Sequence, residues 1–155
     1  MAGSADNSEA GMNESTALRV LIVDDEALIR WAIVETLTQA GDIVLEAADG
    51  AAALRTLTAC GGEVDVVLLD LCLPDCRDLT LLAGIRYLTP AAVVMMTAFA
   101  CPEVVREAAR LGVDRIIGKP FDLREVAVAV HQAGGPPRPR ESLPRGPRSE
   151  PPALE

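Results

Sequence analysis

The sequence predicts an α/β fold in which five parallel strands form a doubly wound sheet, a (βα)5 arrangement. First, short runs of Val, Leu and Ile alternate with helical segments, one unit about every 20–25 residues, and such alternation implies a parallel sheet with helices on both faces. Second, the run at 66–69 is apolar on both of its faces, which is typical of a central strand covered on both sides. Third, acidic or other polar residues follow the strands, where α/β sheets place their chemistry.

The chain begins with a tail, residues 1–17, that is small, polar and acidic and is expected to be disordered. The compact apolar run at 18–23 predicts the first strand. Apolar residues then recur every four positions over 26–40, which predicts a helix that ends at a glycine. The run at 42–47 predicts the second strand, and 51–60 predicts a second helix that a glycine pair ends.

The third predicted strand, residues 65–70, is the centre of the pattern, and Pro74 prevents its continuation. Leucines and an isoleucine on one face predict a helix over 78–88. The apolar run at 92–96 predicts the fourth strand. The next predicted helix, 102–111, begins with a proline, which fits the first turn of a helix.

A short fifth strand is predicted at 115–117, and Asp122 is expected to cap a last helix that runs to residue 133. The segment 134–155 is rich in Pro and Arg, so we expect a disordered tail or linker. The folded domain is therefore predicted to span 18–133.

Composition narrows the function classes. The net charge of −9 is a poor match for phosphate backbones, so no direct nucleic-acid binding is expected, whereas it suits a cation or a partner with a basic face. No apolar run approaches the ~18 residues of a membrane span, and the N-terminus lacks a signal pattern. We therefore expect a cytoplasmic protein without a membrane partner. The four cysteines follow no CxxC pattern and are expected to be reduced thiols.

Five residues at the strand ends carry the predicted chemistry. Asp24 and Asp25 follow the first strand, Asp70 ends the third, Thr97 follows the fourth and Lys119 follows the fifth. These ends are expected to converge in one crevice. Three carboxylates there would repel one another unless a hard cation such as Mg2+ bound them. An adjacent hydroxyl and ammonium can bind an anion, and together these groups predict phosphoryl transfer to an aspartate.

Four motifs carry a family resemblance: VDDE after the first strand, LLDLCLP around Asp70, MTAFA after the fourth strand and KPFD after the fifth. As a set, in this order and spacing, they are highly specific. Over residues 18–133 the chain resembles a response-regulator receiver domain of bacterial two-component signalling. The MTAFA and KPFD sequences are similar to those of receivers in enhancer-binding transcription activators. The resemblance implies the flavodoxin-like strand order 2-1-3-4-5.

The resemblance implies that Asp70 accepts a phosphoryl group from a sensor histidine kinase or phosphotransfer protein. It implies Mg2+ held by the carboxylates of Asp24, Asp25 and Asp70 and by the main-chain carbonyl of Cys72. The protein would be a signalling receiver and no enzyme beyond assisting its own phosphorylation and dephosphorylation.

The resemblance also assigns the response to the signal. Lys119 would pair with Asp70 and then with the phosphoryl group, and Thr97 would bind the same group. The peptide bond between Lys119 and Pro120 would be cis. The face that changes on phosphorylation would consist of the helix at 102–111, the strand at 115–117 and the last helix. Its partner would be a downstream output domain or protein, and the same face could form a homodimer.

Four positions depart from the family pattern. Ile116 stands where receivers often carry an aromatic switch residue, so it is a candidate switch position without the aromatic ring. Asp78 replaces a usual glycine and could cap the helix that follows. Cys72 and Phe99 stand where family members place groups beside the hydrolytic water, and neither orients water well, so slow self-dephosphorylation is expected.

Two alternatives stay open. One is a pseudo-receiver, an interaction module that is not phosphorylated, which Ile116 and Asp78 favour. The other is an enzyme on a similar sheet, such as an aspartate-nucleophile phosphatase or a flavin protein, but Cys72 and the Asp-Asp-Glu sequence stand where those classes need other residues. His131 is expected to be a surface or half-buried residue, and Trp31 and Tyr87 are expected to be packing residues.

Overall fold

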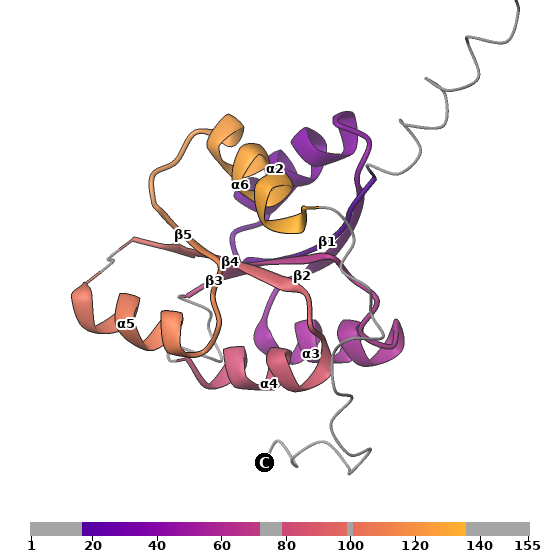
Figure 1. Cartoon of the computed structure of the whole chain (residues 1–155). Coiled ribbons are helices and arrows are strands. Elements are labelled where there is room, and N and C mark those ends of the chain that lie inside the picture. The colour runs from indigo at the N-terminus through magenta and orange to yellow at the C-terminus, as the bar shows by residue number, and fades with distance from the viewer. Residues whose placement is uncertain (1–16, 72–78, 99–100, 136–155) are drawn as a thin grey trace, which may run out of the picture.

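The computed structural model describes residues 17–71, 79–98 and 101–135, in which strands and helices alternate (Figure 1). The strands are β1 (Arg19–Val23), β2 (Ile43–Ala47), β3 (Val66–Asp70), β4 (Ala92–Thr97) and β5 (Arg115–Gly118). The helices are α2 (Ala27–Gln39), α3 (Gly50–Ala59), α4 (Thr80–Leu88), α5 (Pro102–Arg110) and α6 (Leu123–Gly134). Each predicted element is present in these ranges, and most ends lie within a residue or two of the prediction. Of the predicted tails, 1–16 and 136–155 lie outside the described residues.

The strands form one parallel sheet in the order β2-β1-β3-β4-β5, which confirms the predicted fold class. The register decides which residues meet at the carboxyl edge of the sheet. Val23 pairs with Leu69, so the residue after β1 is level with Asp70 at the end of β3. Thr97 pairs with Gly118, which places Lys119 just beyond the same edge.

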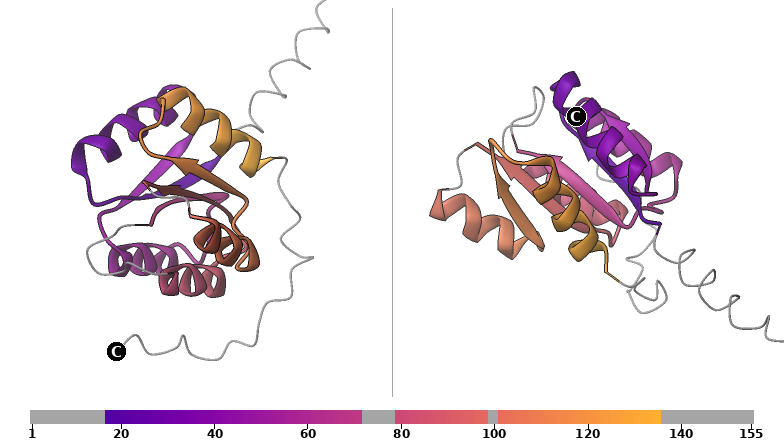
Figure 2. Two further views of the ribbon diagram at one scale, coloured as in Figure 1. Left: turned by 90° about the vertical axis from the view of Figure 1, so that its left-hand side faces the viewer. Right: turned by 90° about the horizontal axis from the view of Figure 1, so that it is seen from above.

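Helices cover both faces of the sheet. Figure 2 shows α2 and α6 on one face and α3, α4 and α5 on the other. Successive strand residues alternate between the two cores: Val20 and Ile22 pack under α2 and α6, whereas Leu21 and Val23 pack against α3 and α4. This alternation follows from the period of two in a strand, and burial on both faces explains why the central runs are apolar throughout.

Local signals position the helices. Asp49 caps α3 by accepting a hydrogen bond from the Ala52 N–H at 2.7 Å, and Asp122 caps α6 by accepting one from the Arg124 N–H at 2.8 Å, as the sequence predicted for Asp122. The predicted helix at 78–88 begins at Thr80, with Leu79 at its N-cap. Asp78 lies outside the described residues.

The prediction that Trp31 and Tyr87 are packing residues was wrong, because their exposed fractions are 60% and 46%. Each stands on the solvent side of an amphipathic helix, where apolar periodicity alone does not assign a residue to the core. His131 on α6 is partly exposed, with 39% of its side chain accessible, as predicted, and its Nε2 lies 2.6 Å from Oδ2 of the buried Asp42. In the part of the chain that the structure describes, no helix has the length and apolar character needed to span a membrane.

Candidate functional site

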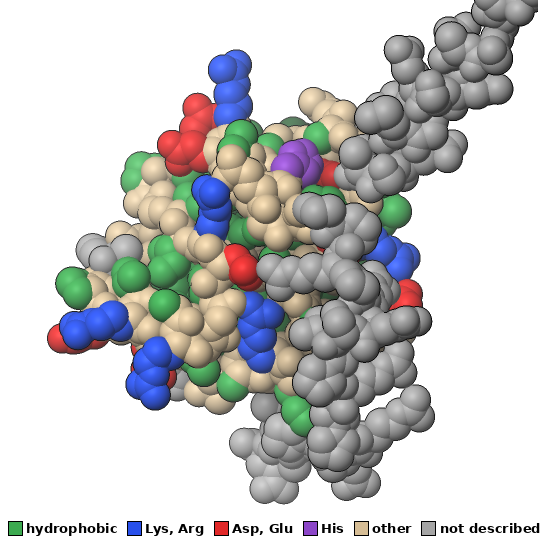
Figure 3. Space-filling model, viewed as in Figure 1, with side chains coloured by type: hydrophobic (Ala, Val, Ile, Leu, Met, Phe, Trp, Pro, Cys, Tyr) green, Lys and Arg blue, Asp and Glu red, His purple; other side chains and the backbone are tan. Residues whose placement is uncertain are grey.

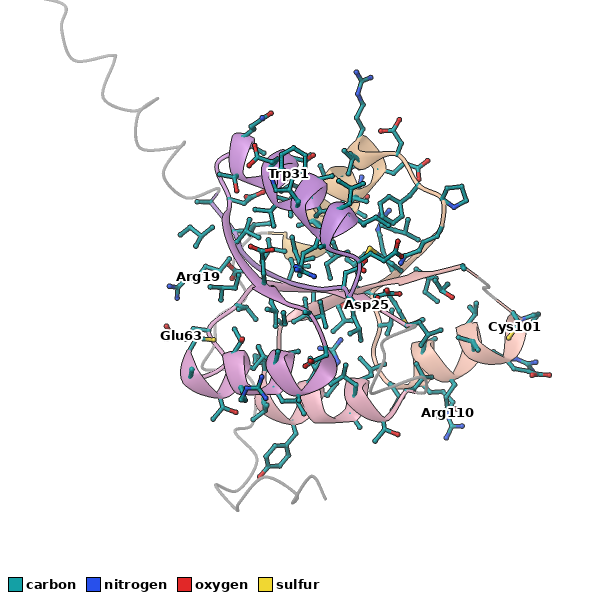
Figure 4. All side chains as sticks on the ribbon, turned by 180° about the vertical axis from the view of Figure 1, so that it is seen from behind. Arg19, Asp25, Trp31, Glu63, Cys101 and Arg110 are labelled. Carbon is teal, nitrogen blue, oxygen red and sulfur yellow. The ribbon has the colours of Figure 1, made fainter. Side chains whose placement is uncertain are left out.

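Three aspartates meet at the carboxyl edge of the sheet. One carboxylate oxygen from each of Asp24, Asp25 and Asp70 lies within 4.8 Å of the others. Asp24 and Asp70 are buried, with exposed fractions of 0% and 3%, whereas Asp25 is exposed (Figure 4). The three aspartates therefore meet as the strand ends predict. Two of their carboxylates are buried and the third is accessible to solvent.

The loop from β1 to α2 is held by main-chain hydrogen bonds. The Asp24 N–H donates to the carbonyl of Ala47 at 3.1 Å, and the Glu26 N–H donates to Oδ1 of Asp24 at 2.8 Å. Nη1 of Arg30 donates to the Asp24 carbonyl at 2.6 Å. The loop is thus tied to the neighbouring strand and to the start of α2, so its main chain and one oxygen of the Asp24 carboxylate are held in place.

Lys119 is the cation of this site. Its Nζ lies 3.1 Å from Oδ2 of Asp70, 3.6 Å from Oδ2 of Asp24 and 3.4 Å from Oε1 of Glu26. Burial lowers the pKa of Lys119, but the hydrogen bond and charge of Asp70, with the charges of Asp24 and Glu26, outweigh burial and leave the pKa raised. The ammonium is therefore charged at neutral pH.

Thr97 on β4 and Ile116 on β5 are the two predicted switch positions. Thr97 ends β4 and is buried, and its carbonyl accepts a hydrogen bond from the Lys119 N–H at 2.8 Å. Ile116 is half-buried on β5, in register with Met95. The Lys119–Pro120 bond is cis, as the resemblance implied.

Oδ2 of Asp24 tests whether the site fits a cation. This oxygen is buried and has no hydrogen-bond partner, the one such side-chain atom found among the described residues. Nζ of Lys119 is 3.6 Å from it. Burial is the largest influence on the pKa of Asp24 and raises it. The hydrogen bond from the Glu26 N–H and the charge of Lys119 lower this pKa, whereas the negative charges of Asp70 and Glu26 raise it. The net result is a pKa above the usual value of an aspartate. A buried oxygen that lacks a partner, beside two more carboxylates, fits a hard divalent cation such as Mg2+.

This raised pKa predicts that Asp24 destabilises the metal-free protein at neutral pH. The folded protein binds the Asp24 proton more tightly than the unfolded chain does, so stability falls as pH rises from the usual range of aspartate through the raised pKa. Asp24→Asn should therefore stabilise the protein at pH 7 in EDTA, which would move the midpoint of unfolding to a higher urea concentration. Urea unfolding at pH 5 and 7 measures this. The exposed control Asp25→Asn should change stability by less than ~0.5 kcal/mol, and a loss of stability in Asp24→Asn would contradict the prediction.

Three residues with predicted roles lie outside the described residues: Cys72, Asp78 and Phe99. Sequence reasoning also missed three residues of the site, namely Glu26, Arg30 and Glu46. Glu26 could have been found, because it directly follows the aspartate pair. Arg30 and Glu46 gave no signal, since a charged residue on a helix or an edge strand is ordinarily solvated.

A model of the response regulator receiver domain matches residues 20–131. The transcriptional regulatory protein KdpE of Mycobacterium tuberculosis is 36% identical over 114 residues, 74% of this chain and 50% of KdpE. The chemotaxis protein CheY of Bacillus subtilis is 31% identical over 118 residues, 75% of this chain and 97% of CheY. A crystal structure of a CheY-like receiver domain protein from Methanospirillum hungatei superposes with a TM-score of 0.70 at 28% identity, covering 76% of this chain and 94% of that one.

The chain therefore belongs to the response regulator receiver domain family. Receiver domains are signalling modules of two-component systems, and the fold, the strand order and the acidic edge of the sheet agree with that membership. The chain spans about half the length of KdpE, whereas it spans nearly all of CheY.

Proposed function

We propose that this chain is a phosphorylatable receiver in which Asp70 accepts a phosphoryl group. The observation that supports the proposal most is the position of Asp70, which is buried at the end of the central strand β3 with its Oδ2 3.1 Å from Nζ of Lys119. Asp24 and Asp25 complete an oxygen donor set beside it. Asp24, Asp25 and Asp70 would hold Mg2+, with the main-chain carbonyl of Cys72 as the further ligand that the resemblance implies.

The reaction needs one bond to form and one to break. A carboxylate oxygen of Asp70 attacks the phosphorus of a phosphohistidine, the P–N bond breaks, and the imidazole leaves with the bonding electron pair and takes up a proton. Mg2+, when bound, supplies charge that neutralises the phosphoryl oxygens. Lys119 stays beside the acceptor and pairs with a phosphoryl oxygen. Hydrolysis by water returns the carboxylate of Asp70 and inorganic phosphate, and the predicted slowness of this step rests on Cys72 and Phe99.

The response to phosphorylation would pass from Thr97 and Lys119 into β5 and α5. The main chains of these two residues are already joined by a hydrogen bond. Among the residues of α5 only Ala108 is fully buried, and Val105 is 37% exposed. Hydrophobic side chains gather over β5 and α5 in Figure 3. We propose that α5, β5 and α6 form the face that changes on phosphorylation. Its partner is an output domain or protein, or a second copy of the chain. Ile116 on β5 acts as a switch position without an aromatic ring.

The phosphoryl donor would approach over the first turns of α2. Leu28 and Trp31 lie one turn apart on this helix, directly after the acidic loop, and their exposed fractions are 77% and 60%. Figure 4 shows Trp31 on the outer side of α2. Exposed large apolar side chains beside a reactive group are typical of a protein contact. A sensor histidine kinase or phosphotransfer protein in the cytoplasm is the proposed donor, with neither nucleic acid nor membrane as a direct partner.

No observation on the described residues favours the alternative of a pseudo-receiver. Of the two positions that suggested it, Ile116 is half-buried on β5 and Asp78 lies outside those residues.

Beryllofluoride, which mimics a phosphoryl group, tests the proposal. With Mg2+ it should shift the amide NMR signals of Asp70, Thr97 and Lys119, because the added group binds the Asp70 carboxylate and draws Lys119 and Thr97 toward it. Asp70→Asn is the matched control and should show no shift. Unchanged spectra of the wild type in the presence of Mg2+ would support the pseudo-receiver instead.

A further inference from the structure

Arg30 links the acidic loop to the edge strand of the sheet. Its Nη1 donates to the carbonyl of Asp24 at 2.6 Å, and its Nε donates to Oε1 of Glu46 at 3.1 Å. The Arg30 side chain is 19% exposed, and that of Glu46 is 50% exposed. One guanidinium therefore connects the start of α2 to the loop after β1 and to β2.

The contact acts on the peptide group between Asp24 and Asp25. The carbonyl of Asp24 and the N–H of Asp25 belong to one rigid plane, so a bond that holds this carbonyl also sets the direction in which the chain enters Asp25. The same residue, Asp24, is held at its N–H by Ala47 and at Oδ1 by Glu26. Arg30 adds the remaining tether, on the main-chain oxygen.

The chemistry of arginine suits this task. Its planar fork can donate to a carbonyl and to a carboxylate at once, in a fixed geometry, whereas a lysine ammonium on a flexible stem lacks that geometry. Glu46 holds the Nε side of the fork, so it orients the Nη1 that reaches the loop. Groups that orient metal ligands in this way commonly change metal affinity by ~10–100-fold when removed.

We propose that Arg30, oriented by Glu46, is a positioning residue that sets the affinity of the acidic loop for Mg2+. The inference rests on the proposed Mg2+ site. It assigns a role to two residues outside the carboxylates that would hold the ion, and it makes β2 a supporting element of the site.

The sign of one measurement separates positioning from charge. Arg30→Gln removes a positive charge close to a cation site, so electrostatics alone would make Mg2+ bind more tightly. Positioning has the opposite consequence, because the freed loop must be ordered when the ion binds. We expect Mg2+ affinity, measured by isothermal titration calorimetry, to fall about 10-fold in Arg30→Gln. Arg30→Lys, which keeps the charge, should lose a similar factor, and Glu46→Gln should lose less.

The chain offers a matched control in α5. Arg110 and Glu107 form an exposed pair with Nη1 3.2 Å from Oε2, and neither residue belongs to the site. Arg110→Gln and Glu107→Gln should leave Mg2+ affinity unchanged. A second readout needs no metal: hydrogen exchange at the Asp25 and Glu26 amides should become faster in Arg30→Gln and stay the same in Arg110→Gln.

The outcomes distinguish this inference from the proposed function. Wild-type protein that fails to bind Mg2+ overturns both. Wild-type binding together with unchanged or tighter binding by Arg30→Gln overturns the role of Arg30 alone. If Arg30→Gln does not fold, Arg30→Lys decides: wild-type affinity and wild-type exchange in that variant would also overturn the role, because charge without the fork would then suffice.

Discussion

Asp70→Ala is expected to abolish phosphorylation of this chain by acetyl phosphate and Mg2+. The wild type should gain the mass of one HPO3 group in intact mass spectrometry, and the variant should gain none. The physical reason is the position of Asp70, whose carboxylate lies at the end of the central strand β3 with Oδ2 3.1 Å from the ammonium of Lys119. The effect is the complete loss of the acceptor rather than a change in its rate.

Two controls support the assignment. Glu107→Gln on α5 removes an acid of the exposed pair with Arg110 and should be phosphorylated like the wild type. Asp25→Asn keeps the acceptor but removes a predicted Mg2+ ligand, so it should be modified slowly. Size-exclusion chromatography of the same samples reports whether phosphorylation changes the oligomeric state. Full modification of Asp70→Ala would show that another group accepts the phosphoryl group.

Lys119→Met should destabilise the metal-free protein by about 2–3 kcal/mol at pH 7. The substitution keeps a stem of similar length but leaves Asp24 and Asp70 without their cation, and an unpaired buried charge costs several kcal/mol. Millimolar Mg2+ should then stabilise the variant more than it stabilises the wild type, because the ion replaces the missing charge. Urea unfolding with EDTA or with Mg2+ measures both effects.

Arg110→Met is the comparison for Lys119→Met, since its ion pair is exposed and contributes ~0–1 kcal/mol. The pH dependence of the wild type provides a further check. Because the pKa of Lys119 is raised, its contribution is fully present below the usual lysine pKa of 10.5 and is lost only as pH rises through the raised value. Equal stability of Lys119→Met and the wild type at pH 7 would contradict the role of Lys119 as the cation of the site.

Much of the site could be predicted because strand ends are a property of local sequence. The apolar run before Asp70 predicts a buried strand, and parallel strands bring their carboxyl ends to one edge. The sequence therefore predicts that Asp24, Asp25 and Asp70 meet there, as they do. Lys119 could be predicted for the same reason, because it directly follows the fifth strand. The cap at Asp122 follows from the hydrogen bonds that a helix start leaves unmade.

Other features could not be predicted because they depend on which way a side chain turns and on what lies across from it. Trp31 has the apolar character of a core residue, but the rotation of α2 on the sheet points it to solvent. Arg86 is an ordinary helix residue in the sequence, yet its guanidinium donates to the carbonyl of Ala91 at 2.5 Å and also to the carbonyl of Gly112, which joins the ends of α4 and α5.

The sequence by itself determined the parallel sheet, its order of elements and the set of acids and the lysine at its edge, because burial on two faces and the period of a strand leave few other arrangements. Only the tertiary structure decided which of those groups contact one another. It gave Lys119 a third carboxylate partner in Glu26, left Oδ2 of Asp24 without a hydrogen-bond partner and brought Arg30 onto the loop from the neighbouring turn. These contacts depend on how the side chains turn and pack in the folded protein, which the order of residues along the chain does not specify.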